Sequence, residues 1–215
     1  MTPRRLAVKA LVHQEQAGYA NLVLDAELKK CAPPLEGRDA AFAARIFYTT
    51  LERLPLLDYI LNQFTKKPIA KLDAPVRAVL RAGLAQARYM NVPLPAAVNE
   101  SVKLTRALGK SSAAGMVNAV LRKFVTNWMN MPEIRCSGTA EYLSIRYSHP
   151  LWLVKRLLEI LPPEEAEQFL RGNNEIVPTT IHTNLLKTDD ETLVEELKQA
   201  IAIFCNCLKL AALEK

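Results

Sequence analysis

With 215 residues, half of them hydrophobic, the chain is long enough to bury the core of one substantial domain and part of a second. It contains no apolar run of about 18 residues, which argues against a membrane-spanning helix, and we expect no signal peptide. Four cysteines without the spacing of a disulfide framework fit a reducing compartment, so we expect a cytoplasmic protein.

The net charge of +6 is unevenly distributed along the chain. Residues 1–130 carry 19 Lys and Arg against 9 Asp and Glu, whereas residues 131–215 carry 9 against 13. The first part is therefore basic, and clustered basic side chains favour a polyanionic partner because they displace counterions from phosphates. A well-solvated surface is the alternative interpretation.

Helix-period hydrophobic spacing runs through most of the first 130 residues, and it predicts a bundle of about seven helices. Asp39 is a candidate N-cap for the third helix, and Asp73 followed by Pro75 is a helix start signal. Gly83 is expected to allow a close contact between helices. We predict helices over residues 3–16, 19–30, the segment after Asp39, 55–64, 75–90 and the two halves of 95–128, joined there by a turn at 109–111. The expected core includes Phe47, Val79, Leu80, Val117, Leu121 and Phe124, with Trp128 continuing the apolar stripe of the last helix.

A stripe of arginines marks the helix that follows Asp73. Arg77, Arg81 and Arg88 fall within about 40° of one another at ~100° per residue, and no carboxylate of that helix shares the stripe. Solvated arginines are the simpler explanation, but the first helix is also basic, so we predict a shared RNA-binding surface. Its predicted residues are Arg4, Arg5, Lys9, Arg77, Arg81, Arg88 and Lys110.

Beyond residue 130 the pattern changes. Residues 131–141 lose the helix period and predict a linker, after which Pro150 and Pro163 each open a helix. Residues 176–186 are β-branched and alternating, which predicts a strand, and Asp189 or Asp190 is expected to cap a final helix.

Two segments carry a family resemblance. The sequences AVNESV (97–102) and GMVNAVLRKF (115–124) resemble the last two helices of the NusB-type RNA-binding domain. The sequences YSHPLWLVKRL (147–157), Asn173-Asn174 and IHTNLLKT (181–188) are similar to the linker and the start of the RNA-binding subdomain that precede the catalytic domain in RsmB/Sun-like small-subunit rRNA cytosine-5 methyltransferases. The combination favours the N-terminal part of such an enzyme.

The resemblance implies a mainly α protein in three parts. These are a NusB-like helical RNA-binding bundle over residues 1–130, a linker over 131–141 and an apparently truncated small α/β subdomain over 142–215. It implies RNA, in particular small-subunit rRNA, as the partner, and S-adenosylmethionine as the cofactor of the full-length enzyme. The catalytic domain would be absent, so the chain alone would have no catalytic or cofactor-binding residues and would not methylate RNA.

Two alternatives from other functional classes remain. A NusB-like antitermination factor would bind RNA together with a ribosomal protein, and a helical protein-interaction module would use the arginines only for solubility.

Several fragments resemble sites without the context that those sites need. Cys136-Ser137-Gly138-Thr139 resembles a family cysteine motif, but it lies in the predicted linker, and nothing there guarantees a base to activate a thiolate. His13, His149 and His182 are scattered, so no metal is predicted. Asn99 and Asn118 are predicted to be buried hydrogen-bonding residues that fix helix packing.

Overall fold

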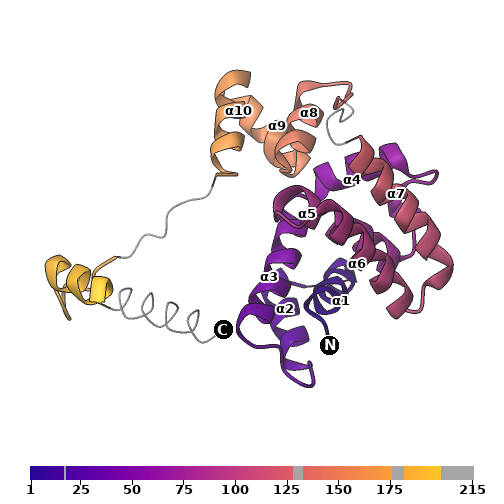
Figure 1. The fold of residues 1–215 in the computed structure, drawn as a ribbon. Helices are drawn as coiled ribbons and strands as arrows, with labels where there is room; N and C mark the ends of the chain where they lie inside the picture. The colour runs from indigo at the N-terminus through magenta and orange to yellow at the C-terminus, as the bar shows by residue number, and fades with distance from the viewer. Residues whose placement is uncertain (17, 128–132, 176–181, 200–215) are drawn as a thin grey trace. The chain divides into compact units, whose positions relative to one another are not determined.

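The computed structural model describes residues 1–16, 18–127, 133–175 and 182–199, and it divides into two units, residues 1–174 and 175–215. The described part of the first unit is helical throughout (Figure 1), which confirms the predicted mainly α fold. Its elements are α1 (Pro3–Gln16), α2 (Ala20–Lys29), α3 (Gly37–Glu52), α4 (Leu54–Phe64), the 3-10 turn η1 (Ile69–Lys71), α5 (Ala74–Tyr89), α6 (Leu94–Ala107), the 3-10 turn η2 (Ser111–Ala113), α7 (Ala114–Thr126), α8 (Thr139–Tyr147), α9 (Leu151–Ile160) and α10 (Pro163–Gly172).

The core is organised around α5, which packs against α1, α3, α4, α6 and α7 and lies in the middle of the bundle in Figure 1. The predicted core residues are confirmed, since all six are at most 2% exposed: Phe47, Val79, Leu80, Val117, Leu121 and Phe124. Trp128 lies outside the described residues.

Gly83 is a point of close approach between helices in this core. A Cβ atom there would lie 2.5 Å from Oγ of Ser101 on α6 and 3.0 Å from Cδ1 of Leu121 on α7. The predicted close contact is confirmed, because only a residue without a side chain leaves room for both neighbouring helices.

Two helix starts differ from the capping expected from the sequence. Asp39 is not the N-cap of α3; Glu36 takes that position, because the helix begins two residues earlier, at Gly37, and Asp39 falls in its first turn. Asp73 is the N-cap of α5 as predicted, but its carboxylate makes no capping hydrogen bond. It pairs instead with Nζ of Lys110 at 2.6 Å.

Helices α8, α9 and α10 have a small core of their own, built from Leu143, Val154 and Leu170. They belong to the same unit as the bundle, and α8 packs against α4. The boundaries predicted at residues 130 and 141 remain predictions.

In the second unit, Asp189 caps the helix that runs over residues 190–199, as predicted. Its Oδ1 accepts a hydrogen bond from the Thr192 amide at 2.7 Å, and its Oδ2 accepts one from the Thr192 hydroxyl at 2.9 Å. These bonds, that of the backbone amide first, hold the pKa of Asp189 below its usual value of 3.8.

The predicted strand over residues 176–186 lies partly outside the described residues, which omit 176–181. Residues 182–186 form irregular backbone and a turn, so the strand prediction is wrong for this part. The turn forms because the carbonyl of Asn184 accepts the Lys187 amide at 2.8 Å, while its side-chain oxygen accepts the Leu186 amide at 3.1 Å.

Within the described residues, no helix is long and apolar enough to cross a membrane.

Candidate nucleic-acid interface

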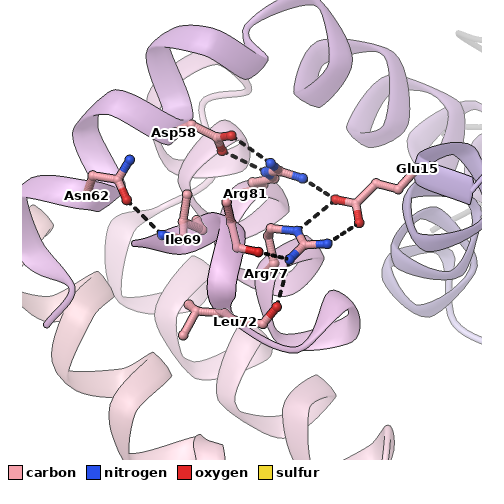
Figure 2. Close-up of polar contacts among 8 residues, drawn as sticks. Glu15, Asp58, Asn62, Ile69, Leu72, Arg77 and Arg81 are labelled. Carbon is pink, nitrogen blue, oxygen red and sulfur yellow. Dashed lines mark hydrogen bonds and ion pairs between the residues drawn. The ribbon is translucent and has the colours of Figure 1, made fainter. Parts of the chain in front are cut away.

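Arg77 and Arg81 of the predicted basic surface form a network of ion pairs (Figure 2). Arg81 donates from Nε and Nη2 to the two carboxylate oxygens of Asp58, at 2.7 and 2.6 Å, and from Nη1 to Glu15. Arg77 donates to the same Glu15 carboxylate, at 3.0 and 2.5 Å. The Arg81 residue is only 8% exposed. The carboxylates missing from the arginine stripe of α5 are therefore supplied by α1 and α4.

The network also holds the turn η1 against α5. Nη1 of Arg77 donates to the carbonyls of Ala70 at 3.0 Å and Leu72 at 2.7 Å. On the other side of the turn, Oδ1 of Asn62 accepts the Ile69 amide at 2.8 Å (Figure 2). The RNA contact predicted for Arg77 and Arg81 remains a prediction, and the structure gives both side chains a structural role.

Glu15 is the carboxylate that these two arginines share. Its hydrogen bond with Arg77 lowers its pKa below the usual value of 4.5; partial burial opposes this shift, and the charges of Arg81 and Arg77 add to it. A carboxylate with a lowered native pKa stabilises the fold above its unfolded pKa, and this contribution is lost as the pH falls through the native value.

We expect Glu15→Gln to lower the free energy of unfolding by about 1–2 kcal/mol at neutral pH, because it removes the negative charge that pairs with Arg77 and Arg81. The loss is smaller than for a fully buried ion pair, since the Glu15 side chain keeps about a fifth of its surface in solvent. The difference in the free energy of unfolding between the variant and wild type should shrink as the pH falls below 4.5, because protonation makes the wild-type carboxyl neutral like the glutamine amide. Urea unfolding at a series of pH values measures this. Glu52→Gln, at an exposed position on α3, is the control and should show no such trend.

Arg4 and Arg5, at the start of α1, lie beside the second half of α6. Nε of Arg4 donates to Oε1 of Gln86 at 2.8 Å, and its guanidinium lies 5.0 Å from the ring centroid of Phe42. Arg4 and Arg5 line a hollow of about 330 Å³ together with Lys103 and Glu100. Lys9 is half-buried on α1. This end of α1 is basic, although Arg4 is already engaged by the bundle.

The remaining two predicted residues lie elsewhere. Lys110, in the turn between α6 and α7, pairs with Asp73 at the start of α5. Arg88, near the end of α5, donates from Nε to the hydroxyl of Tyr89 at 3.1 Å. The seven predicted residues thus divide between the start of α1, the Glu15 network, the turn before α7 and the end of α5.

The prediction for Asn99 and Asn118 is wrong. Asn99 is exposed, and Asn118 is half-buried, accepting a hydrogen bond from Nε of Arg122 at 3.0 Å. Both line an open hollow of about 310 Å³ between α6 and α7 with Arg106. The buried positions of these two helices are occupied by other side chains, such as Ser101 of α6 and Val117 of α7.

The structure contains a second basic site, which the sequence does not predict. A cleft of about 540 Å³ lies between α4, the end of α5 and helices α8 and α10. Four arginines and three tyrosines line it: Arg53, Arg88, Arg146, Arg171, Tyr59, Tyr89 and Tyr147. No local sequence signal groups these residues, because they come from four helices or their ends, spread over more than a hundred positions.

The described residues show neither a metal-binding cluster nor a hydrogen-bonded Cys136 thiol. They contain no group of three or more His, Cys, Asp or Glu side chains that could hold a metal ion. Cys136 is a half-buried free thiol, and no hydrogen bond joins it to a base in the described part of the chain.

This fold and its basic sites define a helical bundle of the NusB class. The family model described as "NusB family" matches residues 1–126, which is more than half of the chain, so the protein belongs to the NusB family. A second model, described as "Methyltr_RsmF/B-like, ferredoxin-like domain", matches residues 149–207.

Similar proteins are named ribosomal RNA small subunit methyltransferase B. That of Sodalis glossinidius is 31% identical over 183 residues, covering 85% of this chain and 40% of the relative. That of Proteus mirabilis is 29% identical over 204 residues, covering 94% and 46%. A probable methyltransferase B of Bacillus subtilis is 30% identical over 197 residues, covering 90% and 43%. The chain therefore spans less than half the length of these relatives.

Two solved structures share the fold. The chain in "Crystal Structure of PH0851" has a TM-score of 0.60 at 20% identity, covering 93% of this chain and 45% of that one. The chain in "Crystal Structure of a Plectonemic RNA Supercoil" has a TM-score of 0.56 at 17% identity, covering 60% and 96%.

Proposed function

We propose that this chain is the RNA-recognition part of a small-subunit rRNA methyltransferase of the B type. The observation that carries the proposal is the order of the two family matches, a NusB match over residues 1–126 followed by the ferredoxin-like match over 149–207. A NusB-like antitermination factor accounts only for the first match, so this alternative is not favoured. Small-subunit rRNA is the proposed partner, and no ribosomal protein is invoked.

The chemistry of the full-length relatives would lie outside this chain. Carbon-5 methylation of cytosine needs a thiolate nucleophile, a proton acceptor and S-adenosylmethionine in one closed pocket. The described residues contain no strand followed by a glycine-rich turn that would fit the adenosyl group, and among them no hydrogen bond joins Cys136 to a base. The role of this chain is to bind and position RNA.

We expect the 215-residue chain to bind fragments of small-subunit rRNA without transferring a methyl group to them. With about three phosphate contacts, affinity should fall roughly tenfold or more between about 50 and 200 mM salt, because each contact contributes about 0.7 to the salt slope on single-stranded RNA. Fluorescence anisotropy measures the binding, and labelled S-adenosylmethionine measures the transfer.

Absence of RNA binding at low salt would overturn the proposal. So would transfer of labelled methyl groups by the isolated chain, above all if Cys136→Ala abolished it. A protein that also carries the catalytic domain is the positive control for transfer.

A further inference from the structure

We propose that the arginine- and tyrosine-lined cleft between α4, the end of α5 and helices α8 and α10 binds unpaired RNA nucleotides. In this site the arginines would contact phosphates and the tyrosines would contact bases. The inference rests on the proposed function and assigns one part of the RNA contact to a defined site.

The first argument is the excess of positive charge in the cleft. Four arginines line the cleft, whereas Glu133 is the one acidic residue among its lining residues. In the described part of the chain, Arg53, Arg146 and Arg171 form no ion pair. Arg77 and Arg81, by contrast, are neutralised by Glu15 and Asp58. A cluster of positive charge without carboxylate partners attracts phosphate.

The carboxylate near Arg146 is already engaged. The Tyr147 hydroxyl donates to Oε1 of Glu167 at 2.7 Å and accepts from Nε of Arg146 at 3.4 Å. Burial, followed by the bond to Glu167, raises the pKa of Tyr147, so this hydroxyl stays protonated at neutral pH and continues to donate to Glu167. The hydrogen bond with Tyr147 is the largest cause that raises the pKa of Arg146, and the charge of Glu167 adds to it.

The second argument is the pairing of planar groups. The guanidinium carbons of Arg53 and Arg88 lie 5.4 and 5.6 Å from the ring centroid of Tyr89, and that of Arg146 lies 5.8 Å from the Tyr147 ring. Unpaired RNA is recognised when splayed bases stack on aromatic rings and guanidinium planes. A cleft with both kinds of group suits single strands better than it suits the regular backbone of a duplex.

The third argument is that the walls are held in place by hydrogen bonds. The Tyr59 hydroxyl donates to the Glu133 carbonyl and accepts the Arg135 amide, both at 2.9 Å. Nδ2 of Asn174 donates to the Tyr147 carbonyl at 2.8 Å, and Arg53 donates to the Asn174 carbonyl at 3.4 Å. The volume of about 540 Å³ lies within the roughly 300–1,000 Å³ range of small-ligand sites. A preformed cleft loses less entropy on binding.

The experiment compares two double variants of the 215-residue chain. R146Q/R171Q removes two exposed arginines of the cleft, and R38Q/R45Q removes two exposed arginines at the start and middle of α3 with the same change in net charge. The probes are a fluorescein-labelled oligouridine of about 12 nucleotides and an RNA duplex of similar length. We expect R146Q/R171Q to weaken oligouridine binding about tenfold and to reduce its salt slope by roughly 1.4, while R38Q/R45Q changes it less than about twofold.

A 4-thiouridine-substituted oligouridine provides a readout that charge alone would not move. Ultraviolet crosslinking followed by mass spectrometry should place the adduct on peptides carrying Tyr59, Tyr89 or Tyr147. Crosslinks confined to other peptides would overturn the assignment of these tyrosines as base contacts.

The remaining outcomes separate this inference from the proposed function. If wild type binds RNA and both double variants weaken it equally, the cleft is not a site, although the proposed function stands. Unchanged binding by R146Q/R171Q would overturn the assignment of the cleft as an RNA site. Equal loss on the duplex would overturn the preference for unpaired nucleotides, and failure of wild type to bind any RNA would overturn both proposals.

Discussion

Replacing Arg81 by alanine is expected to lower the free energy of unfolding by about 2–3 kcal/mol. The Arg81 side chain keeps 10% of its surface exposed, and its removal leaves Asp58 and Glu15, 27% and 22% exposed, with less of their compensating charge. Breaking a fully buried ion pair costs about 3–5 kcal/mol, and the partial access of water to these carboxylates reduces that figure. Equilibrium urea unfolding measures the change.

Arg156→Ala is the matched control for this experiment. Arg156 pairs with Glu159 at 2.7 Å, but both side chains are more than 60% exposed, and such pairs contribute less than about 0.5–1 kcal/mol. Equal losses for the two variants would contradict the structural role of the Glu15 network. If Arg81→Ala left stability unchanged but weakened RNA binding, the direct RNA contact expected from the arginine stripe would be supported instead.

Replacing Gly83 by valine should cost about 2–3 kcal/mol, because the new side chain would overlap with the two helices that cross α5 at this point. Its Cβ would approach Oγ of Ser101 to 2.5 Å, and that hydroxyl already donates to the Ala97 carbonyl at 2.7 Å. Rotating Ser101 away would break this buried hydrogen bond, and leaving it in place would force the helices apart. A lower midpoint in thermal or urea unfolding is the expected result.

Gly115→Ala separates overpacking from the general effect of removing a glycine from a helix. A Cβ at Gly115, in the first turn of α7, meets nothing within 4 Å. This variant should be unchanged or more stable by up to about 0.5–1 kcal/mol, because alanine favours the helix. A similar loss for both variants would show that the space around Gly83 is not what limits substitution there.

The helices could be predicted because their signals are local. The start of α5 at Asp73–Pro75 and the apolar stripe of α7 need only neighbouring residues to define them. The strand prediction failed over residues 182–186 for a related reason, since alternation is a weak signal that a single Asn184 turn overrides. Glu36 displaced Asp39 as the cap of α3 because helix ends depend on a few weak interactions.

The sequence by itself determined the helical class, the core residues and the excess of positive charge, because each depends on residue type and on spacing along one helix. Only the tertiary structure decided what the charges do. It brought Glu15 and Asp58 to Arg81 from positions 66 and 23 residues away. It gathered the arginines at positions 53, 146 and 171 in one cleft, where they form no ion pair with any carboxylate among the described residues. Whether a charge is paired depends on distances of a few ångströms between remote segments, which no local pattern records.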